Sequence, residues 1–256
     1  VAASLTATSA SLSMMGGFQG VLILRREGLE IYERLVKQNP ASVDDQQGLA
    51  VAHTRMASIL MHEGDKAGSI RHYRESLRVQ QGLYRTHVGE AQFQIALALA
   101  HSNLGNALRA AGDGKHALEE LREAKRLFEP VVNADANEVR ARTLLATVRL
   151  RESKVWMDLG DTERAGRIMR SVLEERRLLS ERNPANAGAK GEVAEAHGVL
   201  GDIELRAGRY AGAVAQYETA LGVLAEMEQA RRSNSADREE KERILERLAE
   251  ARKKLP

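Results

Sequence analysis

The sequence predicts an all-α fold, a superhelix of antiparallel helix pairs, and three observations support this prediction. Glycines recur at intervals of 48 residues, at Gly64, Gly112, Gly160 and Gly208. Between them, apolar residues recur at steps of three to five residues, and no segment of useful length alternates with a period of two. The chain has 4 Pro in 256 residues and 4% aromatic residues, so we expect a core of Leu, Val, Ile and Ala.

Each 48-residue unit repeats the same sizes of side chain in the same places, which we call columns. Two columns hold small residues: Ala57, Gly105, Ser153 and Gly201, then Ser69, Ala117, Ala165 and Ala213. One column holds large residues: Tyr73, Leu121, Met169 and Tyr217. Small residues let two helices approach closely, and large residues fill the space to the next pair. The columns therefore predict stacked helix pairs that share one continuous core.

The period sets the expected order of the helices within four repeats, at 43–86, 90–134, 138–182 and 186–230. The first helix of each pair, helix A, is predicted at about 43–62, 90–110, 138–158 and 186–206. The second, helix B, is predicted at about 66–86, 114–133, 162–182 and 210–230. A Gly stop separates the two helices of each pair. We expect Pro130 to kink or end its helix early, because it has no N–H and clashes with the preceding turn.

The two ends follow the same register. Residues 4–38 are predicted to be a partial first pair, with a short helix at about 4–15 and a helix B at 18–38. Residues 236–255 are predicted to be a capping helix whose apolar face includes Leu245, Leu248 and Ala249. Residues 1–256 are thus predicted to form a single repeat domain. The chain begins with Val, so we expect it to be a segment of a longer protein.

The run from His101 to Leu108, followed by Gly112-Asp113, Ala117, Leu121 and Ala124, resembles the tetratricopeptide repeat (TPR). The resemblance covers nearly the whole chain and implies a right-handed superhelix. The repeat is longer than the usual 34 residues, the Pro that usually ends helix B is missing, and Glu152 stands where Leu is expected. This long form, with its Asn-Pro-Ala-Asn boundary at 183–186, looks like repeats that follow the catalytic domain of certain bacterial serine/threonine protein kinases. That likeness implies a regulatory or docking region.

Composition and motifs argue against most other functions. The 38 basic and 36 acidic residues nearly cancel, which disfavours a nucleic-acid partner. No apolar stretch approaches the ~20 residues of a membrane span, and we expect a cytoplasmic protein. The chain has no Cys, no closely spaced His pair, no His-Arg-Asp and no Asp-Phe-Gly. Gly112 to Ala117 mimics a dinucleotide loop, but a predicted helix precedes it instead of a strand. We therefore expect no catalytic residues, no metal site and no cofactor.

What remains is the surface. By resemblance to the family, helix A residues line the concave side and bind a peptide or partner protein. The candidate groove residues are Arg55, Ser58, Asn103, Asn106, Arg151, Lys154 and Asp202. Asn106 matches an Asn that grips a peptide main chain in some family members, and Arg151 and Lys154 can hold a carboxylate. Two alternatives stay open: these residues are ordinary solvated surface, or the chain is a structural spacer or self-association module. The sequence leaves the oligomeric state undetermined.

Overall fold

The computed structural model describes residues 2–134, 139–183, 185–230 and 232–255, with side chains described from residue 20 onward. All regular secondary structure in these residues is α-helical. The described residues form two compact units, Val1–Ala134 (unit 1) and Asp135–Pro256 (unit 2). The single domain expected over 1–256 therefore stays a prediction, and we describe each unit by itself.

Unit 1 is a run of helices in which each packs against the next in sequence. A long helix comes first and two helix pairs follow it. The helices are α1 (Ala2–Gln38), α2 (Val43–His62), α3 (Lys66–Thr86), α4 (Ala91–Ala110) and α5 (Gly114–Ala134). Helices α2 and α4 are the A helices and α3 and α5 the B helices, within one or two residues of the predicted bounds.

Unit 2 has two helix pairs and a last helix that covers the second pair. Its helices are α6 (Val139–Asp158), α7 (Thr162–Arg182), α8 (Ala187–Arg206), α9 (Tyr210–Gln229) and α10 (Ser235–Lys253). Helix α8 contacts α6 and α10 as well as its direct neighbours α7 and α9. The first helices α6 and α8 therefore lie side by side, and α10 takes the place that a further helix A would have.

The periodic glycines form the predicted turns between paired helices. Their φ angles are positive, a conformation that only Gly adopts without strain: 83° at Gly64, 88° at Gly112, 87° at Gly160 and 73° at Gly208. The residue after the glycine is the N-cap of the next helix, as at Asp65 and Asp161. Asp65 accepts a hydrogen bond from the N–H of Gly68 at 2.8 Å, and Asp161 accepts one from Arg164 at 2.9 Å. Each Gly-Asp pair thus ends one helix and caps the next.

The small columns are where paired helices touch. A Cβ added to Gly105 would lie 2.9 Å from Leu121 Cγ and 3.1 Å from the carbonyl oxygen of Ala117. In unit 2 the side chain of Ser153 is fully buried and donates a 2.9 Å hydrogen bond to the carbonyl of Ala165. The packing that the columns predict is confirmed within each unit.

The N-terminal end differs from the prediction. A break was expected near Gly16, but residues 2–38 form one continuous helix, α1. Gly16 is followed by Gly17, whereas Gly64, Gly112 and Gly160 are followed by a capping Asp. Without a residue that favours a helix start, the helix continues through both glycines at a cost of roughly 1 kcal/mol each. Helix α1 therefore has no separate helix A of its own.

The early end of the helix at Pro130 and the predicted apolar face of the last helix are both wrong, whereas a kink at Pro130 stays a prediction. Helix α5 runs through Pro130 to Ala134; Pro130 is exposed, so water can hydrate the carbonyl that its missing N–H leaves without a donor. The buried face of α10 consists of Ile244, Leu248 and Ala251, while Leu245 is 47% exposed. In the complete repeats, the corresponding side of helix A faces its helix B. No helix B follows α10 in the described residues, so that side of α10 is open to water.

Candidate binding surface

The candidate groove residues of unit 1 lie on its two A helices. Arg55 and Ser58 are exposed on α2. Asn103 and Asn106 are half-buried one repeat later on α4, and Asn103 takes part in an interaction within the chain. The surface of α2 is therefore the more accessible of the two.

In unit 2 the candidate residues already have partners inside the protein. Arg151 and Lys154 are half-buried on α6, and Arg151 takes part in an interaction within the chain. The Nζ atom of Lys154 lies 3.4 Å from Oε1 of Glu195 on α8. The carboxylate that Lys154 holds is thus one of the protein's own.

Asp202 links three helices. It accepts a 2.7 Å hydrogen bond from the hydroxyl of Tyr217 on α9 and a 2.7 Å hydrogen bond from Arg243 on α10. Burial and the negative charge of Asp202 raise the pKa of Tyr217, and hydrogen bonding to Glu240 raises the pKa of Arg243. Asp202 therefore holds the capping helix in place, and its carboxylate oxygens are occupied.

A buried ion cluster stands behind this surface. Arg176 on α7 is only 2% exposed, and it donates hydrogen bonds to Oε2 of Glu195 at 3.0 Å and to the carbonyl of Glu192 at 2.7 Å. Burial acts to raise the pKa of Glu195, but Lys154 and Arg176 together bring it below its usual value. Arg176 was not predicted from the sequence, although it stands in a column whose other members, Gln80, Phe128 and Leu224, are buried. A charged residue in a buried column is the signal that would have found it.

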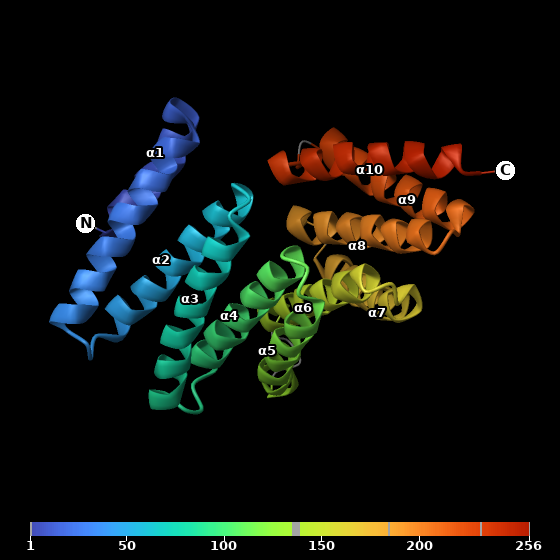
Figure 1. The fold of residues 1–256 in the computed structure, drawn as a ribbon. Helices are drawn as coiled ribbons and strands as arrows, with labels where there is room; N and C mark the ends of the chain where they lie inside the picture. The colour runs from blue at the N-terminus through green and yellow to red at the C-terminus, as the bar shows by residue number, and fades with distance from the viewer. Residues whose placement is uncertain (1, 135–138, 184, 231, 256) are drawn as a thin grey trace. The chain divides into compact units, whose positions relative to one another are not determined.

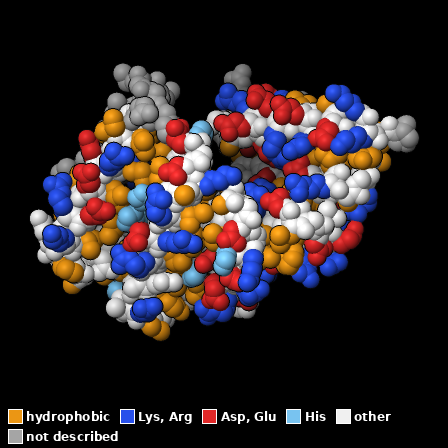
Figure 2. All heavy atoms as spheres, viewed as in Figure 1, with side chains coloured by type: hydrophobic (Ala, Val, Ile, Leu, Met, Phe, Trp, Pro, Cys, Tyr) orange, Lys and Arg blue, Asp and Glu red, His pale blue; other side chains and the backbone are white. Residues whose placement is uncertain are grey.

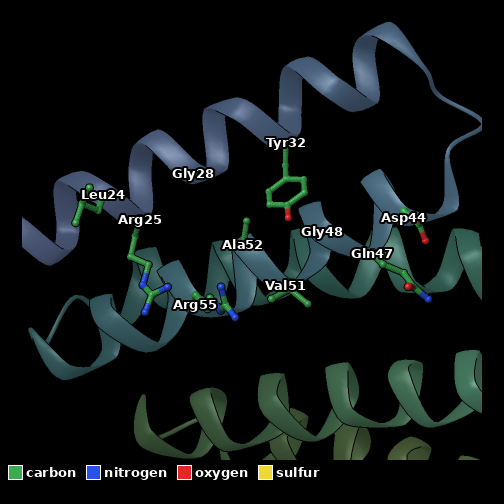
Figure 3. A pocket seen from close by; sticks show the side chains of 10 residues that line it. All are labelled: Leu24, Arg25, Gly28, Tyr32, Asp44, Gln47, Gly48, Val51, Ala52 and Arg55. Carbon is green, nitrogen blue, oxygen red and sulfur yellow. The ribbon is translucent and has the colours of Figure 1, made fainter. Parts of the chain in front are cut away.

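Unit 1 has a pocket of about 310 Å³ between α1 and α2, shown in Figure 3. It is lined by Leu24, Arg25, Gly28, Tyr32, Asp44, Gln47, Gly48, Val51, Ala52 and Arg55. Tyr32 packs against Gly48, where a Cβ would collide with its ring. A Cβ added at Gly28 would meet no atom within 4 Å, so the pocket is open there. Arg55 is the only candidate groove residue among these lining residues.

Arg25 is the unusual member of this pocket. Its Nε atom and one of its terminal nitrogens are buried, and they have no hydrogen-bond partner in the part of the chain that the structure describes. Burial lowers the pKa of Arg25, and the positive charge of Arg55 lowers it further. Two guanidinium groups therefore share this pocket without a bound counter-charge among the described side chains.

The His column joins the two helices of a pair. Nδ1 of His53 lies 3.0 Å from Nδ1 of His72, His101 lies 2.6 Å from Glu120, and His197 lies 2.8 Å from Gln216. Burial and the neighbouring His72 lower the pKa of His53 to about 4. Within the described residues, no group of three His, Asp or Glu is arranged to hold a metal ion. These histidines are explained by packing between helices, as the column predicts.

The fold matches solved structures of helical repeat proteins. RapI in its apo form is similar with a TM-score of 0.62, at 9% identity over 97% of this chain and 83% of that one. A protein of nearly identical TPR-like repeats from Podosopora anserina has a TM-score of 0.58, at 13% identity over 88% and 95% of the two chains. The fold is TPR-like. The thermophilic TPR protein TTC0263 from Thermus thermophilus is also similar, with a TM-score of 0.50 and 20% identity over 97% of this chain and all of that one.

These likenesses establish the TPR-like architecture alone. No protein-family model matches the sequence, and no curated protein matches it. In addition, none of the helices in the described ranges has the length and apolar character needed to cross a membrane. The surface of a TPR-like fold is therefore the starting point for the function.

Proposed function

We propose that this TPR-like chain is a non-catalytic scaffold that binds a peptide or partner protein on its A helices. The observation that carries the proposal is the surface of α2, where Arg55 and Ser58 are exposed beside an open pocket. Stacked helix pairs characteristically present such surfaces to an extended segment of a partner. The groove itself, and the roles of Asn103, Asn106, Arg151, Lys154 and Asp202 in it, belong to the same proposal.

Surface charge supports a protein partner over a nucleic acid. On the face drawn in Figure 2, Lys and Arg side chains are interspersed with Asp and Glu in both units. Nucleic-acid surfaces instead gather basic side chains into a patch or stripe. A mixed surface suits a partner that itself carries both charges.

A peptide array probed with the whole chain tests the proposal. We expect specific spots for the native chain and at least tenfold weaker binding for Ser58→Arg, because a long charged side chain would block the A-helix surface. The matched control is Ser171→Arg, an exposed position on helix B α7, which we expect to bind like the native chain. Equal loss in both variants, or no loss in Ser58→Arg, would contradict the α2 surface as the binding site.

We extend the proposal to the setting of the chain: a cytoplasmic docking region of a bacterial serine/threonine protein kinase. Two features support it, the 48-residue period and the Asn183 to Asn186 boundary, both of which resemble repeats found in such kinases. The test is the complete open reading frame. His-Arg-Asp and Asp-Phe-Gly motifs upstream of Val1 are the expected result, and an unrelated upstream domain would overturn this part alone.

The second candidate function is a spacer or self-association module, and unit 2 favours it. Lys154 and Asp202 are occupied internally, while Leu178 is 51% exposed on helix B α7. Sedimentation over a range of protein concentrations separates the candidates. A mass that rises with concentration and returns to that of the monomer in Leu178→Glu would support self-association, whereas a constant monomer mass would contradict it.

A further inference from the structure

The pocket between α1 and α2 exists because α1 departs from the repeat. Arg25 occupies the column that holds Tyr73, Leu121, Met169 and Tyr217 in the complete repeats. In unit 2 that position packs against the small residue of its own helix A, as Tyr217 does against Gly201. Helix α1 is continuous and has no separate helix A. At this position α1 therefore places the charged side chain of Arg25 beside an open pocket, where the complete repeats place a core side chain.

The two guanidinium groups lie at the same end of the pocket. Figure 3 shows Arg25 reaching from α1 toward α2, with Arg55 beside it, while Asp44 lies toward the opposite end of α2. Two buried nitrogens of Arg25 have no hydrogen-bond partner among the described residues, and Arg55 is exposed to solvent. Asp44 is thus the single carboxylate that lines the pocket, and it stands away from both cations.

Leaving the buried donors of Arg25 without a partner costs free energy. A buried N–H without an acceptor loses the hydrogen bonds that water would supply. Two like charges in one partly buried pocket also repel each other. An anion placed between them would relieve both effects, because Arg presents N–H donors in a planar fork that suits a carboxylate or a phosphate.

We infer that this pocket binds an oxyanionic side chain of a partner peptide, a carboxylate or a phosphate ester, between Arg25 and Arg55. The inference rests on the proposed scaffold function and names the ligand chemistry for it. The pocket volume of about 310 Å³ accommodates one side chain, and the residues around the cations, such as Leu24 and Ala52, are apolar and can pack on its stem. The hydroxyl of Tyr32, which Figure 3 shows directed from α1 toward α2, is a third donor within the same pocket.

Binding to small probes tests the site on the whole chain. Titrations would use inorganic phosphate and three capped pentapeptides that differ only in a central Glu, phosphoserine or Gln. Calorimetry gives the affinity, and the NMR signals of the Arg Nε–H groups locate the site. We expect phosphate and at least one anionic peptide to bind, with Gln at least tenfold weaker. A preference for Glu or for phosphoserine identifies the source of the oxyanion.

Variants separate this site from a general attraction to anions. Arg25→Gln and Arg55→Gln should each weaken binding about tenfold or more, whereas Arg26→Gln, an exposed Arg outside the pocket, should leave it unchanged. Gly28→Met keeps both cations and fills the open space, so it should also weaken binding. Circular dichroism and the melting temperature of each variant show that it is folded.

The inference would be overturned by equal weakening in Arg26→Gln, by equal affinity for the Glu, Gln and phosphoserine peptides, or by binding that survives Gly28→Met. The proposed function fails differently. If the peptide array gives spots that Ser58→Arg abolishes but that contain no acidic or phosphorylated residue, the scaffold stands and the oxyanion site does not. If phosphate binds between the arginines but no peptide does, the site stands without a peptide partner, and the inference as stated is wrong.

Discussion

Arg25 in unit 1 and Arg176 in unit 2 both stand in columns that the repeat fills with core residues, yet their surroundings differ. Arg176 is buried against Glu192 and Glu195, with hydrogen bonds to both residues. Arg25 meets another arginine, Arg55, across an open pocket. A buried charge that has a partner avoids the large cost of an uncompensated one. The unpaired one indicates a place where a partner supplies the opposite charge.

The terminal helices repeat this contrast. Helix α10 covers α8 and α9 through Arg243, which donates a hydrogen bond to Asp202 on α8, and through the buried side chains Ile244 and Leu248. Helix α1 contacts α2 but leaves a pocket beside it. One end of the repeat series is closed by its own side chains, and the other offers unpaired donors. The predictions below test this difference, beginning with the largest effect.

Removing the partner of Arg176 should be the most damaging change. In Glu195→Gln the buried guanidinium loses its carboxylate, and the free energy of unfolding should fall by about 3 kcal/mol, the lower end of the range for broken buried pairs because Glu195 is partly exposed. Urea unfolding measures the loss. The control Glu181→Gln breaks an exposed pair with Arg177 and should cost less than about 0.5 kcal/mol. A similar small loss in both variants would show that the cluster does not stabilise unit 2.

Acid should weaken unit 1 through His53. Its pKa is about 4 in the folded chain against 6.5 ordinarily, so the unfolded chain takes up a proton first and stability falls as the pH drops from 6.5 toward 4. The loss should reach about 2 kcal/mol by pH 4.5, since each pKa unit corresponds to about 1.4 kcal/mol. His53→Gln should remove most of this dependence, and the remainder comes from His72, whose pKa is also lowered by burial. His72→Gln gives His53 the same partner that His197 has in unit 2, where it contacts Gln216. This variant should remove less than half of the pH dependence, because burial lowers the pKa of His53 more than His72 does.

Two glycines compare the closed and the open packing directly. Gly201→Ala puts a methyl group into the ring of Tyr217, and we expect a net loss of about 1 kcal/mol after the gain in helix propensity. Gly28→Ala puts the same group into the pocket, where no atom lies within 4 Å, and should stabilise the chain by up to about 1 kcal/mol. Thermal unfolding of both variants gives the signs. Equal signs would mean that the α1 and α2 packing is as tight as that of α8 and α9.

The sequence predicts structure well where structure depends on local chemistry. The turns at Gly64, Gly112, Gly160 and Gly208 follow from glycine's backbone freedom, and the helix bounds follow from the turns. The partners of Lys154 and Asp202 were missed, because Glu195 and Arg243 each lie 41 residues away in the sequence and Tyr217 lies 15 residues away on the next helix. Arg25 and Arg176 were also missed, although the columns held the signal: each is a charge at a position where the other repeats place a core residue.

The smallest effect compares the two arginines when each is made apolar. Arg25→Met removes an unpaired charge and its repulsion with Arg55, so we expect a gain of about 0.5 kcal/mol in phosphate-free buffer, kept small because the group is partly exposed. Arg176→Met should have the opposite sign, since it leaves Glu195 and Glu192 without their buried cation. Arg26→Met is the control for surface charge and should change the melting temperature little. Because the two substitutions are chemically identical, opposite signs can only come from the surroundings.

A loss above about 1 kcal/mol in Arg25→Met would mean that Arg25 stabilises the fold, and an outside anion would then no longer be needed to explain the pocket.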